Sequence, residues 1–282
     1  TAHATDRGTF RALARTVKKE DEDMDTNSDR PGYEPSLDNP AQIDTTTPRY
    51  SAVQRLWMVF TSPAEVFADI RIKPTWILAL VLMVVFGVVI QVVIMPHIDI
   101  ESSIRARLAD RAAEVSDEQI DEIVEGQQKF AKFGPLMALI IGPIAWALMA
   151  AVFLVCLKIV GSEIDFKSTL STALHAYWPP SVVGGSLAMI LIQRVGLIPQ
   201  EEVANVVKAH PAAFMSPDSP PWLLATAGTF SIFNIWIVVL LVIGFKIVGQ
   251  LSTARATIAA LIPWVAWMIM KAGLSMIAGL FS

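Results

Sequence analysis

Few side chains in the apolar parts of this sequence could take part in chemistry. His175 lies in an uncharged stretch, where a neutral imidazole could bind a metal, a haem or a pigment. The alternative is a histidine at the membrane or its surface that hydrogen-bonds to a neighbouring group. Lys271 lies near the end of the last apolar stretch, where its stem can extend to lipid headgroups. Asn234 is expected to form a hydrogen bond between helices.

The sequence motifs of common enzyme classes are missing from the chain. It contains no His-Glu-x-x-His, no Gly-x-Ser-x-Gly, no glycine-rich phosphate loop with lysine and no pair of cysteines. No two carboxylates lie within the apolar stretches, which argues against an aspartyl membrane protease or a carboxylate proton relay. We therefore predict a protein that is not an enzyme, with no catalytic residues, no metal site and no cofactor.

Five long apolar stretches must position these side chains. A helix rises about 1.5 Å per residue, so about 20 apolar residues cross the hydrocarbon core of a bilayer. The stretches lie at about 75–95, 133–157, 173–197, 223–246 and 257–281. They predict an all-α, polytopic membrane protein with a five-helix transmembrane bundle in residues 75–282. Pro179 and Pro180 leave open a start of the third span near Ser181.

Residues 1–48 form a polar tail with too few apolar residues to fold alone. One alternative is an intrinsically disordered segment, and the other is a short basic amphipathic helix on a partner or on anionic lipid. Three apolar and three basic residues recur in this tail at helical spacing. They are Phe10, Leu13 and Val17, and Arg7, Arg11 and Arg15. We predict that these six residues bind a partner subunit.

Residues 49–74 are predicted to form two short amphipathic helices at the membrane surface. Ser62 is suited to the N-cap of the second helix, Pro63 to its first position and Glu65 to the closing position of a capping box. Pro74 is expected to begin the first spanning helix. The apolar face of the first short helix comprises Val53, Leu56, Trp57 and Phe60.

The loop at residues 96–132 is predicted to be a helical hairpin outside the bilayer. Ile104 and Leu108 lie one helical turn apart in its first arm. Ser116 and Gln119 form a predicted capping box at the start of the second arm. The acidic run that follows is expected to be a solvated face rather than a cation site.

The length of the loops, rather than the count of flanking basic residues, decides the predicted orientation. Eight of them lie on the side of the N-terminus and seven on the other side. The loops on the first side are shorter, and short loops dominate the positive-inside rule. We predict a multi-pass protein of the bacterial inner membrane with a cytoplasmic N-terminus and an outside C-terminus.

Three groups of residues, in this order, resemble bacterial YIP-domain membrane proteins over residues 50–282. The first is Ser62-Pro63-x-Glu65-x-Phe67-x-x-Ile70, followed by Pro74-x-Trp76. The second is Gly161 and Phe166 ahead of Ala176-Tyr177-x-Pro179, which resembles a loop and the start of the third helix. The third is Ile235-Trp236-x-x-x-Leu240-x-x-x-Gly244, which resembles the fourth helix.

The resemblance implies five spanning helices, a cytoplasmic N-terminus and no enzymatic activity. Eukaryotic relatives bind small GTPases of vesicle traffic, but this chain lacks their acidic-Leu-Tyr-Gly-Pro type stretch, which puts a GTPase partner in doubt. We predict a non-catalytic scaffold or accessory subunit that contacts the lipid bilayer and other membrane subunits, and no nucleic acid. The alternatives are a transporter or channel component and a pigment- or cofactor-carrying subunit that uses His175.

Overall fold

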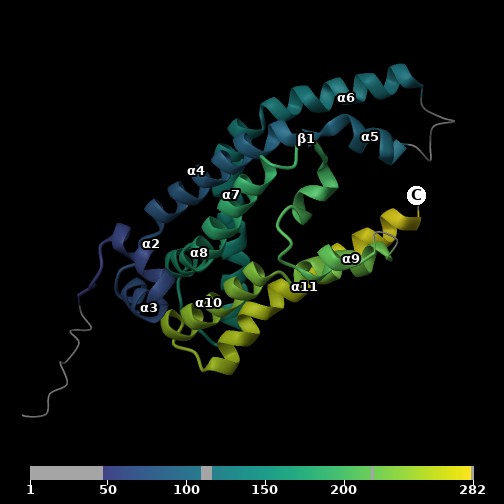
Figure 1. Ribbon diagram of the computed structural model, residues 1–282. Coiled ribbons are helices and arrows are strands. Elements are labelled where there is room, and N and C mark those ends of the chain that lie inside the picture. Colours follow the sequence, from purple (N-terminus) through teal and green to yellow (C-terminus); the bar gives the residue numbers. More distant parts are fainter. Residues whose placement is uncertain (1–46, 109–115, 217–218, 281–282) are drawn as a thin grey trace, which may run out of the picture. The chain divides into compact units, whose positions relative to one another are not determined.

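The computed structural model describes residues 47–108, 116–216 and 219–280, which are almost entirely helical (Figure 1). The helices are α2 (Ala52–Thr61), α3 (Pro63–Ile72), α4 (Trp76–Ile94), α5 (Ile100–Leu108), α6 (Asp117–Lys132), α7 (Gly134–Ile159), α8 (Phe166–Ile192), α9 (Pro221–Thr229), α10 (Ile232–Val248) and α11 (Thr253–Leu280). The short elements are η1 (Met95–His97), β1 (Ile98–Asp99), β2 (Ile198–Pro199), η3 (Gln200–Asn205) and η4 (Pro211–Phe214).

Several of these helices are long and apolar enough to cross a membrane. In the described part of the chain, three qualify by themselves: α4 together with η1, α7, and α11 as far as Ile277. The pair α9 and α10 qualifies as a fourth, with a bend of 48° between them. The structure thus confirms a helical protein with several membrane-capable helices, and gives their number as three or four.

Helix α8 differs from these because other helices, rather than lipid, surround its first half. It packs against α2, α3, α4, α7 and α10. Every residue from Thr169 to Ala176 is buried, including three hydroxyl side chains and a histidine. These polar residues lower the hydropathy of a helix that is 27 residues long.

The start of α8 is fixed by Asp165, whose carboxylate accepts a hydrogen bond of 2.7 Å from the Ser168 backbone N–H. This is an N-cap contact, which supplies a partner for one of the unpaired N–H groups of a first helical turn. The helix then continues through Pro179 and Pro180 to Ile192. The helix therefore does not begin near Ser181, whereas the point at which a span begins along α8 stays a prediction.

The fourth predicted span is broken where α9 ends and α10 begins. Ser231 caps α10 by accepting a hydrogen bond of 3.3 Å from the Phe233 N–H. The Asn234 side chain donates to the Thr229 carbonyl over 3.0 Å. Asn234 was expected to donate a hydrogen bond between helices, and it does so from α10 to the last residue of α9. Its amide supplies a partner for a carbonyl that the break leaves without its helical partner.

Helices α5 and α6 form the predicted helical hairpin. The Ser116 side chain accepts from the Gln119 N–H, and the Gln119 side chain accepts from the Ser116 N–H, which confirms the capping box. Ile104, Ile120 and Val124 are buried between the two arms. A two-residue parallel pairing of β1 with β2 connects this region to the chain that follows α8.

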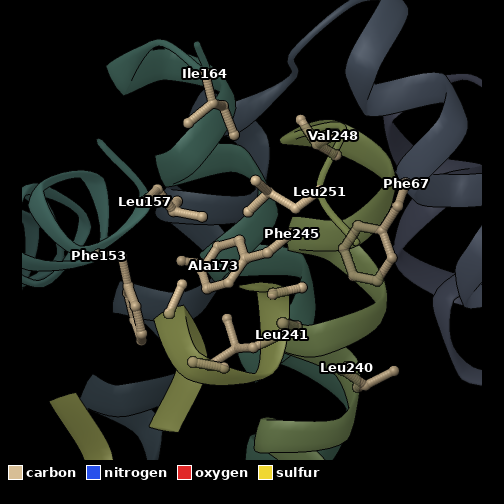
Figure 2. Close-up of a cluster of buried hydrophobic side chains, with 14 of the residues drawn as sticks. Phe67, Phe153, Leu157, Ile164, Ala173, Leu240, Leu241, Phe245, Val248 and Leu251 are labelled. Carbon is tan, nitrogen blue, oxygen red and sulfur yellow. The ribbon is translucent and has the colours of Figure 1, made fainter. Parts of the chain in front are cut away.

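The main apolar core lies where α3, α7, α8, α10 and α11 meet (Figure 2). Phe153 and Phe245 are in ring contact there, with centroids 5.3 Å apart. Gly244 permits the close approach of α10: a Cβ at this position would lie 2.5 Å from Thr172 Cγ2 and 3.0 Å from Phe67 Cε1. A glycine at this point of the YIP-like motif therefore serves packing between helices.

Two predictions about the segment before α4 are wrong. Helix α3 begins at Pro63 as predicted, but the Ser62 side chain makes no capping hydrogen bond. With φ −134° and ψ 58°, Ser62 lies outside the extended conformation that is usual for an N-cap, since it also ends α2. Helix α4 begins at Trp76 rather than Pro74, because Thr75 is not helical.

Candidate functional site

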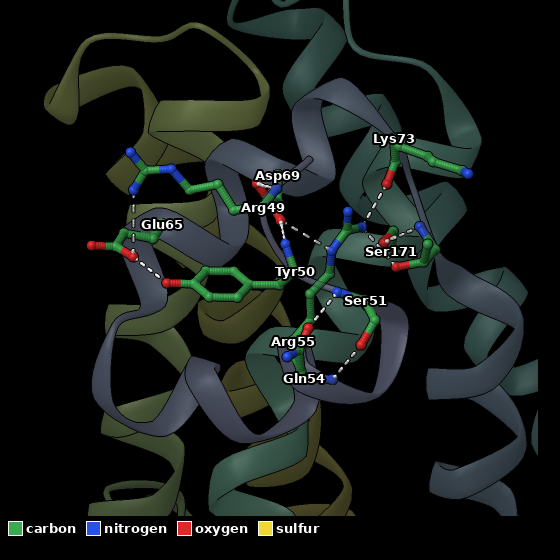
Figure 3. A network of polar contacts seen from close by, with 10 residues as sticks. Arg49, Tyr50, Ser51, Gln54, Arg55, Glu65, Asp69, Lys73 and Ser171 are labelled. Atoms are coloured by element: carbon green, nitrogen blue, oxygen red, sulfur yellow. Dashed lines mark hydrogen bonds and ion pairs between the residues drawn. The ribbon is translucent and has the colours of Figure 1, made fainter. Parts of the chain in front are cut away.

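Two opposite charges are buried where α2 and α3 meet the beginnings of α4 and α8 (Figure 3). The Arg55 side chain is 1% exposed and the Asp69 side chain 3% exposed, and Arg55 Nε lies 3.6 Å from Asp69 Oδ2. Burial lowers the pKa of Arg55, and the charge of Asp69 opposes this shift. An arginine keeps its proton under such conditions, so the two residues form a buried ion pair.

Backbone groups and the Thr75 hydroxyl form hydrogen bonds with the two charges, while Arg55 Nε has no hydrogen-bond partner among the described residues. Arg55 Nη1 donates to the Lys73 carbonyl over 2.6 Å and to Thr75 Oγ1 over 2.9 Å. The carboxylate of Asp69 accepts from the backbone N–H groups of Arg49 and Tyr50, over 2.9 and 2.7 Å. The pair thus connects the chain before α2 with the chain between α3 and α4.

The polar contacts continue into α8. The Thr75 N–H donates to Ser171 Oγ over 3.3 Å, and His175 Nδ1 lies 2.8 Å from the Ser171 carbonyl. A carbonyl only accepts, so this contact places the imidazole proton on Nδ1. His175 is buried rather than facing a membrane, and its Nε2 has no hydrogen-bond partner among the described residues.

The outer surface of α2 and α3 carries exposed polar and aromatic groups. Tyr50 Oη donates to Glu65, which also lies 3.9 Å from Arg49. The hydrogen bond to this carboxylate raises the pKa of Tyr50. Trp57, which was predicted on the apolar face of α2, is 72% exposed. Glu65 therefore contacts the chain before α2 and does not form the predicted capping box.

This arrangement fixes helices in place. Each charge of the Arg55–Asp69 pair is bound by its counterpart or by backbone, and Ser171 contacts a backbone N–H. Within residues 47–108, 116–216 and 219–280, no group of three His, Cys, Asp or Glu side chains could hold a metal together. What the network does chemically is bind α2 and α3 to α4 and α8.

The other predicted site residues lie apart from this network or border it. Trp76 packs against the cluster around Leu56, and Trp236 contacts Phe60 edge to face with ring centroids 6.4 Å apart. Pro179 is buried in α8. The six predicted partner-binding residues lie outside the described residues. They are Arg7, Phe10, Arg11, Leu13, Arg15 and Val17.

Arg55 and Asp69 were not predicted as site residues, although the sequence contains a signal for them. Arg55 lies one helical turn before Val59, and Asp69 lies between Phe67 and Ile70 on the buried side of α3. One charge on the apolar face of each of two adjacent short helices, with opposite signs, is a pattern that predicts a buried pair. Basic residues near a span were instead interpreted only as flanking charges.

The membrane-capable helices in the described residues define the class of protein, a helical multi-pass integral membrane protein. The Yip1 domain family matches residues 57–274, and the chain belongs to this family. This confirms the YIP-domain resemblance of the sequence. The chain is similar to the membrane protein YknW of Bacillus subtilis (strain 168), with 28% identity over 216 residues, which are 73% of this chain and 84% of YknW. No solved structure matches.

Proposed function

We propose that this protein is a non-catalytic scaffold or accessory subunit of a larger membrane complex. The observation that carries this proposal is the Arg55–Asp69 network at the start of the folded part of the chain. Because Asp69 accepts hydrogen bonds from the N–H groups of Arg49 and Tyr50, the point at which the N-terminal segment leaves the helices is fixed. A partner bound by residues 1–48 would then be held at a defined position beside the bundle.

The proposal includes five membrane spans, formed by α4, α7, α8, the α9–α10 pair and α11. The position of α8 supports its inclusion, since it packs against two of the membrane-capable helices, α4 and α7, and against α10. A span surrounded by other spans can carry hydroxyl groups and a histidine, because these groups find partners within the protein. An odd number of spans places the two termini on opposite sides.

Charge supports an inner-membrane location with a cytoplasmic N-terminus. Residues 49–75, 157–167 and 246–256 adjoin one another at one end of the long helices, and carry eight basic and four acidic side chains. Described residues at the opposite end, 96–108, 116–133 and 193–216, carry six basic and nine acidic side chains. The first end has short loops rich in Lys and Arg, as cytoplasmic loops do.

Deletion of residues 1–46 tests the scaffold function. We expect the shortened chain to remain folded, because it keeps every residue of the main apolar core, from Val59 to Ala260. We expect co-purifying subunits to be lost, as measured by quantitative mass spectrometry of protein purified in mild detergent. A matched variant that changes only Arg7, Arg11 and Arg15 to Gln should lose part of the partner. Unchanged co-purification, or solute transport by the protein alone in vesicles, would contradict the proposal.

Labelling of single cysteines tests whether α8 is a span. In a Cys156→Ser background, Glu163→Cys precedes α8 and Lys208→Cys follows it. We expect a membrane-impermeant maleimide added to intact cells to label position 208 and to leave position 163 unlabelled until the cells are opened. Glu122→Cys in α6 is the control and should behave as position 208 does. Equal labelling of positions 163 and 208 from one side would show that α8 does not cross.

A further inference from the structure

The loops after α7 and after α10 meet at the basic end of the bundle. Ser162 Oγ donates to the Gly249 carbonyl over 2.9 Å, which connects the two loops directly. The guanidinium of Arg255, in the first turn of α11, reaches the end of α7: its Nη1 lies 3.8 Å from the position that a Cβ on Gly161 would occupy. Gly161 has φ 85°, a conformation that favours glycine. The end of α7 and the start of α11 therefore present their cations at one place.

Exposed apolar side chains continue from these cations along both helices. On α11, Ile258 and Ile262 follow Arg255 at helical spacing and are 50% and 45% exposed. On α7, which ends at this place, Val155 and Val152 precede Lys158 and are 59% and 51% exposed. Since α7 packs against α11, the two apolar rows lie on neighbouring helices.

The charges at this place are predominantly positive but not exclusively so. Lys158 Nζ lies 3.6 Å from Glu163, and both side chains are exposed. Asp165 accepts hydrogen bonds at the start of α8. Arg255 has no ion pair among the described residues, and Lys246, Lys167 and Lys73 are exposed at the same end. An exposed ion pair such as Lys158–Glu163 is worth little and exchanges readily for another anion.

We propose that this α7–α11 face binds an anionic phospholipid. The phosphate contacts Arg255 and Lys158, and the acyl chains lie along Val152, Val155, Ile258 and Ile262. A guanidinium binds phosphate through two parallel hydrogen bonds. An apolar row that continues along the helix from the cation fits a lipid better than it fits a soluble anion or an acidic peptide. This inference goes beyond the scaffold function and does not depend on a protein partner.

Native mass spectrometry of the full chain in mild neutral detergent tests the proposal. Phosphatidylglycerol is titrated, with phosphatidylethanolamine as the lipid of no net charge. We expect the double variant Arg255→Gln, Lys158→Gln to bind phosphatidylglycerol about tenfold more weakly than the native chain, because charged hydrogen bonds to the phosphate are lost. The matched control Arg194→Gln, Lys208→Gln at the opposite end should bind normally. Binding by the native chain should weaken as salt increases.

Three results would overturn the proposal. They are equal binding of both lipids, a loss of binding only in the opposite-end variant, and displacement of the lipid by equimolar glycerol 3-phosphate or an oligoglutamate peptide. Unchanged thermal unfolding of each variant excludes misfolding as the cause of a loss, and Arg255→Lys should restore part of the affinity. Co-purification of partner subunits is a separate readout. A negative result for lipid binding therefore does not contradict the scaffold function.

Discussion

Replacing Asp69 with Ala is expected to lower the free energy of unfolding by about 3–5 kcal/mol, because it leaves a buried guanidinium without its counter-charge. The Arg55 side chain is 1% exposed, so water cannot take over the role of the carboxylate. The backbone N–H groups of Arg49 and Tyr50 would lose their acceptor as well. Equilibrium unfolding in mixed micelles, followed by tryptophan fluorescence, measures the loss.

The double variant Arg55→Met, Asp69→Leu provides the control for this prediction. Replacing both buried charges by apolar groups of similar size is often close to neutral, whereas removing one partner is not. We expect the double variant to be more stable than Asp69→Ala, and the two positions to show a coupling energy above about 1 kcal/mol. Additive effects of the two single changes would contradict a direct pair. An effect of Asp69→Ala below about 1 kcal/mol would show that the pair is hydrated.

The network also has a consequence for the N-terminal segment. Asp69→Ala should increase proteolysis near Arg49 while the long helices remain resistant, because the two hydrogen bonds that fix this part of the backbone are lost. The site is thus a structural anchor with a testable effect on position as well as on stability. It connects local chemistry with the proposed role in holding a partner.

Helical segments were predictable from sequence where one local signal dominated. The apolar runs of α4, α7 and α11 have few competing signals, and the Ser116 capping box is a four-residue pattern that needs no tertiary contact. The same pattern failed at Ser62, since that residue must both end α2 and begin α3. The order of residue types does not predict the backbone angles of a single residue that joins two helices.

Most of the candidate site depends on contacts over long distances in the sequence. The hydrogen bond between Thr75 and Ser171 joins residues 96 positions apart. No helical periodicity of the sequence indicates such a contact. The residue type of His175 made it a candidate, but its burial could not be predicted from the sequence. Burial depends on which helices surround α8. The break between α9 and α10 was likewise not predictable, since an uncharged run predicts a continuous span.

Replacing Phe67 with Ala is the second change with a large expected effect, a decrease of about 3–5 kcal/mol in the free energy of unfolding. Removing the buried phenyl ring leaves a cavity that the surrounding helices cannot close. Phe67 is fully buried in the core that Figure 2 shows. Its ring lies against Gly244, where a Cβ would come within 3.0 Å of Phe67 Cε1. The backbone of α10 therefore forms one wall of the cavity and cannot move inwards without disturbing Thr172 on α8.

Trp57→Ala is the matched control, since Trp57 is an aromatic residue of the adjacent helix and is 72% exposed. We expect it to change the unfolding free energy by less than about 0.5 kcal/mol in the same micelles. Equal losses for the two variants would mean that α3 does not pack on α10 as described. If Phe67→Ala instead unfolds α2 and α3 alone, cleavage at that end will rise while circular dichroism retains the signal of the long helices. That outcome would identify the two short helices as a separate cooperative unit held on the bundle by Phe67 and the Arg55–Asp69 pair.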